Sequence, residues 1–346
     1  MKLLSTSYWI FLFLTTLGLW ADKPIIDWYA WRDAATAVES YERPDFIFMN
    51  SGKNSPYSGK YSDVLLLSDW TLFEVDQKRA EGYKKIIGLI TEPTFSMNRL
   101  LDPEKNKPYS WIETNLYKFD LILTFNKYLL DKYPEKCKFI HPIGFGTLYH
   151  QGIHEKSKLC SHMASDQRLT DGHQLRWAIV DKYRHLFDSC KEGNSVWSEW
   201  KDPWLNDFYF SVIVENSRES YYFSEKILEC FRAGTVPIYW GCPTIGEFFD
   251  EEGIIVFNSL EELEPILKSL SVDEYQKRLP SIRRNFELAE QYPQFRLGPC
   301  RHKPVVSVDP ECTWEYSATR PDVMDSIWPY VKPYFESPSE AQELEK

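Results

Sequence analysis

Hydrophobic and polar positions between residues 207 and 257 alternate in blocks that predict a strand, a helix and a second strand. The run Phe208–Val214 is apolar and rich in aromatic and β-branched residues, as is typical of a strand buried on both faces of a parallel sheet. After a polar segment, Ser224 is a suitable N-cap for an amphipathic helix that ends at Gly234. The apolar run Val236–Trp240 predicts the strand that completes a βαβ unit.

The first half of the chain also alternates short apolar runs with helical or loop segments, which predicts an α/β fold. Its strand-like runs are Pro44–Asn50, Tyr61–Ser68, Lys85–Thr91, Phe119–Phe125 and Lys138–Pro142. In the second half, a helix is expected from His173 to Phe187 and a charged helical stretch from Ser271 to Gln291.

A length of 346 residues exceeds what one hydrophobic core usually serves, so we expect two domains. The periodic pattern breaks between Gly144 and Cys160, which places an N-terminal α/β domain at residues 22–150 and a second α/β domain at residues 155–295. Residues 296–346 are rich in proline and aromatic residues and are expected to form an irregular extension. The net charge of −11 argues against a nucleic-acid partner, because such proteins normally present a basic face.

Residues 1–21 join Lys2 to an apolar stretch from Tyr8 to Trp20. This pattern is typical of a signal peptide, although an uncleaved membrane anchor and a buried N-terminal strand or helix stay open. A leader would direct the protein to the secretory pathway or the cell envelope, with membrane association through the N-terminus in the anchored case. Without one the protein would be cytoplasmic.

Seven cysteines show no CxxC motif and no zinc-like spacing. Cys300 and Cys312 flank a proline-containing loop and would form a disulfide only in an oxidising compartment. The chain also lacks a D-x-D triplet, so we expect no metal ion.

Polar residues follow the strand Phe208–Val214, and ligands of open α/β sheets bind beyond the carboxyl ends of the strands. The residues expected to face this crevice are Glu215, Asn216, Tyr222, Glu225 and Lys226. A cation in the first turn of a helix opposes the helix dipole, so Lys226 is either a solvated lysine or a phosphate ligand. The same alternatives hold for Arg176, which we place in the first turn of the helix from His173.

The segment from Glu215 to Gly241 reads E-N-S-x-x-x-Y-Y-x-S-E-K-I-x-x-C-x-x-A-G-T-V-P-I-Y-W-G and resembles the donor-binding signature of the α-1,3/4-fucosyltransferases. The resemblance is dense within this segment and patchier outside it. It implies a GT-B fold, with two Rossmann-like domains facing each other across a cleft. It also implies an inverting transfer of L-fucose from GDP-fucose to a hydroxyl group of an oligosaccharide or glycoconjugate.

The same resemblance implies roles for individual residues. Arg176 and Lys226 would bind the diphosphate in place of a metal ion, and Glu225 would lie close to the fucose ring. Asn216 and Tyr222 would contact the nucleotide or the sugar.

Glu92 is the candidate base, because it follows the apolar run Lys85–Thr91 and Pro93 fixes the exit of the loop. An ordinary capping or exposed glutamate is the other interpretation, since the flanking residues TEPTF depart from the family pattern. Two rival functions also stay open, namely a glycosyltransferase that uses another nucleotide sugar and a catalytically inactive glycan-binding scaffold. The sequence names neither the acceptor nor the linkage.

Overall fold

The computed structural model describes residues 23–29, 40–42, 45–51, 59–94, 110–142, 145–146, 148, 150–193, 201–292, 295–296 and 323–335. The chain divides into two compact units. The first comprises the described residues of Met1–Leu89, Lys118–Asp120 and Ile327–Lys346, and the second those of Ile90–Tyr117 and Leu121–Ser326. The predicted leader and the pair Cys300 and Cys312 lie outside the described residues.

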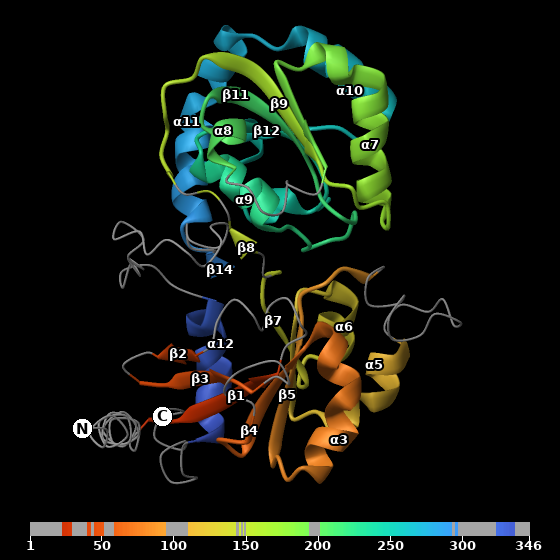
Figure 1. The fold of residues 1–346 in the computed structure, drawn as a ribbon, viewed down its shortest axis with the longest axis vertical. Helices are drawn as coiled ribbons and strands as arrows, with labels where there is room; N and C mark the ends of the chain where they lie inside the picture. Colours follow the sequence, from red (N-terminus) through yellow and green to blue (C-terminus); the bar gives the residue numbers. More distant parts are fainter. Residues whose placement is uncertain are drawn as a thin grey trace, which may run out of the picture. The chain divides into compact units, whose positions relative to one another are not determined.

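A seven-stranded sheet has the order β2-β3-β1-β4-β5-β6-β7 (Figure 1). Its strands are β1 (Ile25–Tyr29), β2 (Ser40–Glu42), β3 (Ile47–Asn50), β4 (Val64–Ser68), β5 (Lys85–Ile90), β6 (Leu121–Thr124) and β7 (Cys137–Phe139). The strands β1, β3, β4 and β5 run parallel, as do β6 and β7, whereas β2 is antiparallel to β3. Four of the five apolar runs predicted in this half contain a shorter strand, the run Lys138–Pro142 overlaps β7 only at residues 138 and 139, and β1 and β2 were not predicted.

Short helices follow several of these strands. They are α3 (Val75–Ala80), α5 (Ser110–Asn115) and α6 (Lys127–Lys132). Within the C-terminal segment expected to be irregular, the structure forms α12 (Val323–Val331), in which Ile327 and Val331 are fully buried. The sequence pattern hid this helix because Pro329 lies inside it.

A five-stranded sheet in the second unit has the order β10-β9-β11-β12-β13, and all of its neighbouring strands are parallel (Figure 1). Its strands are β9 (Lys158–Ala164), β10 (Ser189–Glu192), β11 (Phe208–Val214), β12 (Val236–Trp240) and β13 (Ile255–Val256). The predicted runs at 208–214 and 236–240 match β11 and β12 to the residue. The remaining two short strands, β8 (Phe145–Gly146) and β14 (Phe295–Arg296), pair with each other.

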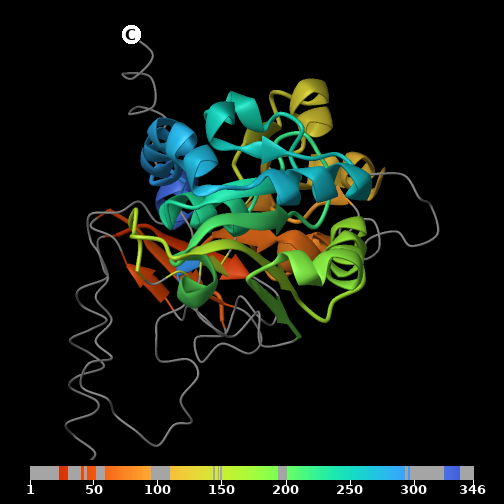
Figure 2. The ribbon, with the colours of Figure 1, turned by 90° about the horizontal axis from the view of Figure 1, so that it is seen from above.

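Helices cover both faces of this five-stranded sheet. They are α7 (Asp171–Tyr183), α8 (Asp202–Leu205), α9 (Glu225–Arg232), α10 (Leu260–Ser269) and α11 (Val272–Ala289). Ile179 of α7 packs with Val212 in one apolar cluster, while Ile227 of α9 packs with Ile213 in another. Because alternate residues of a strand point to opposite faces, α7 and α9 lie on opposite faces of β11. Seen from above, the light-green helix α7 runs beside β9 (Figure 2).

The strand order identifies where this sheet can bind a ligand. In chain order the five strands are arranged 2-1-3-4-5, the doubly wound pattern whose order reverses between the first and third strands. These two strands are β9 and β11, so the crevice is expected beyond Ala164 and Val214. One mainly parallel and one fully parallel sheet, with their helices, confirm the α/β class and provide the two Rossmann-like sheets that a GT-B fold requires. None of the helices in the described ranges is long and apolar enough to cross a membrane.

Candidate active site

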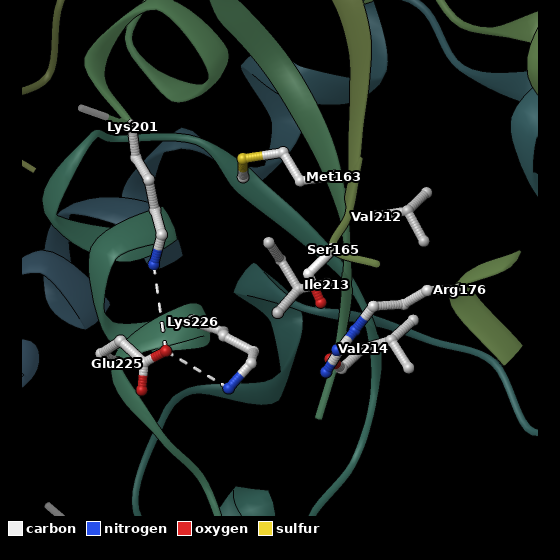
Figure 3. Close-up of a pocket in the computed structure, with 9 residues that line it drawn as sticks. All are labelled: Met163, Ser165, Arg176, Lys201, Val212, Ile213, Val214, Glu225 and Lys226. Atoms are coloured by element: carbon white, nitrogen blue, oxygen red, sulfur yellow. Dashed lines mark hydrogen bonds and ion pairs between the residues drawn. The ribbon is translucent and has the colours of Figure 1, made fainter. Parts of the chain in front are cut away.

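A pocket opens at this switch point (Figure 3). Its residues come from the ends of β9 and β11, from α7 and α9, and from the residue before α8. They are Met163, Ser165, Arg176, Lys201, Val212, Ile213, Val214, Glu225 and Lys226. The side chains of Arg176 and Lys226 point towards the same space in the close-up. Three sequence-predicted site residues, Arg176, Glu225 and Lys226, are thereby brought together.

Arg176 is held rigidly by the end of β11. Its Nε and Nη2 donate to the Val214 carbonyl at 3.0 and 2.6 Å, and Nη2 also donates to Asn216 Oδ1 at 2.8 Å. We placed Arg176 in a first helical turn, which is wrong. The helix begins at Asp171 after an N-cap at Thr170, so Arg176 lies in the second turn and its side chain is buried.

The start of α7 can approach β11 this closely because residue 172 is a glycine. A Cβ on Gly172 would lie 1.7 Å from the carbonyl oxygen of Glu215, well inside van der Waals contact. The Gly172 amide instead donates to the Asn216 carbonyl at 3.2 Å. This close packing of α7 against β11 places Arg176 beside the C-terminal end of the strand.

Lys226 is held at the first turn of α9. Ser224 caps the helix, and the Lys226 ammonium donates to Ser224 Oγ at 2.9 Å and to Glu225 Oε1 at 3.2 Å. Its Nζ is also 3.6 Å from Oε2 of Glu215. Glu215 itself is fully buried and accepts from the amide and hydroxyl of Ser224 at 2.9 and 2.6 Å. We therefore assign Glu215 to fixing the strand-to-helix connection.

Glu225 lies between two lysines. Its Oε1 is 3.2 Å from Lys226 Nζ and 3.9 Å from Lys201 Nζ (Figure 3). Burial raises the pKa of this carboxyl, but Lys226 and Lys201 outweigh burial and bring the pKa to about 2. Glu225 is therefore ionised throughout the neutral range.

Lys201 was missed at the sequence level. It precedes α8, and its ammonium donates to Glu229 Oε2 while also facing Glu225. Burial lowers the pKa of Lys201, but Glu229 and Glu225 raise it by more, so the ammonium stays charged. No helical stripe or strand end points to this residue, because it lies outside regular structure and its partners are far along the chain.

Asn216, Tyr222 and Glu92 stand apart from the residues that line the pocket. Asn216 reaches the site through its hydrogen bond to Arg176. Tyr222 is buried, and its ring packs 5.2 Å from that of Phe125. Burial raises the pKa of Tyr222 well above its ordinary value, and the charges of Glu215, Glu92 and Glu225 raise it further.

Glu92 lies two residues beyond the end of β5 and is partly buried. It is therefore at the carboxyl edge of its sheet, as expected. Among the described residues, no group of three or more histidine, cysteine, aspartate or glutamate side chains is placed to hold a metal ion.

Curated proteins similar to this chain are fucosyltransferases. An α-(1,4)-fucosyltransferase from Arabidopsis thaliana is 22% identical over 149 residues, which cover 36% of this chain and 37% of that protein. An α-(1,3)-fucosyltransferase, FucT, from Helicobacter pylori is 31% identical over 55 residues, which cover 16% of this chain and 12% of that protein. The matches thus span well under half of either relative. No protein-family model matches the chain.

Solved structures that align with this chain include an α1,3-fucosyltransferase with GDP-fucose. The alignment has a TM-score of 0.46 at 16% identity and covers 75% of this chain and 82% of that one. The pneumococcal O-GlcNAc transferase GtfA, in complex with UDP and GlcNAc, aligns with a TM-score of 0.38 at 14% identity over 66% of this chain and 54% of that one. The resemblance to fucosyltransferases inferred from the sequence motif is confirmed by the curated relatives.

Proposed function

We propose that this chain is an inverting glycosyltransferase that moves L-fucose from GDP-fucose to a hydroxyl group of a glycan. The observation that carries the proposal is the convergence of Arg176, Lys226 and Glu225 at the switch point of the second sheet. Two cations in one pocket can pair with the negative charges of a diphosphate. The carboxylate beside them can stabilise the positive charge that develops on the sugar. The match to fucosyltransferase relatives supports fucose as the sugar.

In this mechanism the bond between the fucose C1 and the diphosphate oxygen breaks as a bond from the acceptor oxygen to C1 forms. Arg176 and Lys226 stabilise the negative charge that develops on the departing GDP. Glu225, which is ionised, stabilises the positive charge of the oxocarbenium-like transition state. Glu92 takes the proton of the acceptor hydroxyl.

The remaining assignments follow from this division of labour. Residues 155–295 would bind the donor, with Asn216 orienting Arg176 and with Tyr222 beside the nucleotide or sugar. Residues 22–150 would carry Glu92 and the acceptor surface. An oligosaccharide or glycoconjugate acceptor, and delivery through residues 1–21 to the secretory pathway or cell envelope, complete the proposal.

Calorimetric titration of the purified chain with GDP-fucose, GDP-mannose and UDP-sugars tests the donor. We expect GDP-fucose to bind more tightly than the other sugar nucleotides. Tighter binding of another sugar nucleotide would reassign the donor and keep the reaction class. Absence of binding by all of them would favour an inactive scaffold.

A further inference from the structure

The charged groups around the pocket alternate in sign along one chain of contacts. Glu229 pairs with Lys201, which faces Glu225, which pairs with Lys226, whose Nζ lies 3.6 Å from Glu215. Arg176 adds a third cation to the two lysines. Three carboxylates and three cations give a site that is neutral before a ligand binds.

A bound diphosphate disturbs this balance at Lys226. An ammonium group has three N–H donors, and those of Lys226 are directed at Ser224 Oγ, Glu225 and the vicinity of Glu215. To donate to a phosphate oxygen, Lys226 must give up part of its interaction with these groups. Glu215 keeps both hydrogen bonds from Ser224 when this happens. Glu225 then loses its ion pair with Lys226, which is the nearer of its two lysines.

We propose that Lys201 is the positioning residue that keeps Glu225 ionised and in place once Lys226 has turned to the diphosphate. This inference rests on the proposed function and adds a residue to it. Lys201 is suited to the task because it is itself anchored. Glu229 accepts from Lys201 with one oxygen and from the Leu148 amide, at 2.7 Å, with the other.

The spacing along α9 explains why one lysine serves both carboxylates. Glu225 and Glu229 are four residues apart on a helix, so their side chains lie on the same face. Lys201 reaches this face from the residue before α8, with only 12% of its side chain exposed. Burial at this position makes the ion pair less screened than it would be on the surface.

The charged and titratable groups near Glu225 bear on its protonation. The charged ones are Lys201, Lys226, Arg176, Glu215, Glu229 and Glu92, and Tyr222 is neutral because its pKa is raised. His173 also responds to the ligand, because burial and the charges of Arg176 and Lys226 bring its pKa to about 3. A diphosphate would raise the pKa of His173 equally in every variant that keeps Arg176 and Lys226. A difference between these variants in the number of protons taken up therefore reports on Glu225.

The test is the number of protons taken up when GDP binds. It is measured by calorimetry at pH 6 in buffers of different ionisation enthalpy. The variant is Lys201→Gln, which replaces the ammonium with an uncharged N–H donor, and the control is Lys182→Met on the exposed surface of α7. We expect Lys201→Gln to take up about one more proton per GDP than the wild type, because a buried carboxylate without a counter-ion protonates.

Two further variants separate Glu225 from Glu229. The double variant Lys201→Gln with Glu229→Gln removes a cation and a carboxylate together, so it keeps the balance of charge and serves if the single variant does not fold. It should show the same extra proton. Lys201→Arg should restore the wild-type count.

Equal proton counts in the wild type and in both Lys201→Gln variants would overturn the role of Lys201 and leave the proposed function standing. Failure of the wild type to bind GDP would overturn both. An extra proton in the single variant but not in the double variant would assign the protonation to Glu229, and would also overturn the proposal.

Discussion

Two largely enclosed carboxylates, one in strand β1 of the seven-stranded sheet and one in helix α9 beside the five-stranded sheet, have opposite electrostatic environments. Asp27 of β1 is fully buried and accepts from neutral donors, namely the amides of Tyr61 and Ser62 at 2.9 and 3.2 Å and the Tyr83 hydroxyl at 2.8 Å. Burial outweighs these hydrogen bonds and raises the pKa of Asp27 to about 6. Glu225 of α9 is flanked by two lysines, and its pKa is about 2.

The difference between these two environments indicates which region is suited to bind a charged ligand. All three neutral donors bind Oδ2 of Asp27, while Oδ1 is buried without a hydrogen-bond partner among the described residues, so this carboxylate joins β1 to neighbouring backbone without an ion pair. The region around Glu225 holds three cations against three carboxylates, an arrangement that costs desolvation and that the proposed binding of a diphosphate would explain. Asp27 therefore serves as the internal control for substitutions at the proposed site.

Glu92→Gln should have the largest effect. Loss of a general base lowers the transfer rate by about 10²–10⁴-fold, while binding of GDP-fucose should be unchanged. Steady-state kinetics and calorimetry measure the two quantities. The control Asp27→Asn makes the same acid-to-amide change at a buried position and should retain the wild-type rate. A Glu92→Gln enzyme as active as this control would remove Glu92 from the mechanism.

Glu225→Gln comes next. If its negative charge stabilises the transition state, kcat should fall by about 10²–10³-fold with GDP affinity retained or increased. Affinity does not suffer because the amide no longer competes with phosphate for Lys226. Loss of GDP affinity in parallel with kcat would show instead that Glu225 serves binding or folding.

The pH dependence of stability should differ in sign between the two carboxylates. The folded pKa of Asp27 lies above its ordinary value of 3.8, so the folded state binds more protons and stability falls by about 3 kcal/mol as pH rises from about 4 to 6. The folded pKa of Glu225 lies below its ordinary value of 4.5, so its contribution of about 3 kcal/mol is present above pH 4.5 and is lost as pH falls towards 2.

Chemical denaturation of wild type, Asp27→Asn and Glu225→Gln from pH 2 to pH 7 measures both contributions. Relative to wild type, Asp27→Asn should lose the component that falls between pH 4 and 6. Glu225→Gln should lose the component that falls below pH 4.5. If the free energy of unfolding varied with pH in the same way in all three proteins, the two carboxylates would not have opposite pKa shifts.

The sequence predicted this fold best where burial is complete. Because β11 and β12 are covered on both faces, their residues form unbroken apolar runs that mark the strands directly. The Ser224 cap likewise identified the start of α9. At α7 the true cap, Thr170, was overlooked, and this error moved Arg176 into the wrong turn.

The site was only partly predictable for a different reason. Glu225 and Lys226 adjoin a strand end and a helix start, so local pattern and motif identify them. Lys201 lies 28 residues before Glu229, and their ion pair exists only because α8 and α9 pack around the same sheet. A contact of this kind leaves no periodic trace in the sequence.

Lys226→Ala should have the smallest effect of the four. Removing one charge-assisted hydrogen bond to a phosphate weakens binding by about 1.5–3 kcal/mol, which corresponds to a GDP dissociation constant about 10–150-fold higher. The Glu215 carboxylate keeps its bonds to Ser224, so the fold should persist, but the thermal midpoint should fall because Glu225 loses the lysine that lowers its pKa most. Lys84→Ala, at a position where 75% of the side chain is exposed, is the matched control. If GDP affinity is unchanged in Lys226→Ala, the cation pair is not the phosphate site, and the contrast with Asp27 no longer indicates ligand binding.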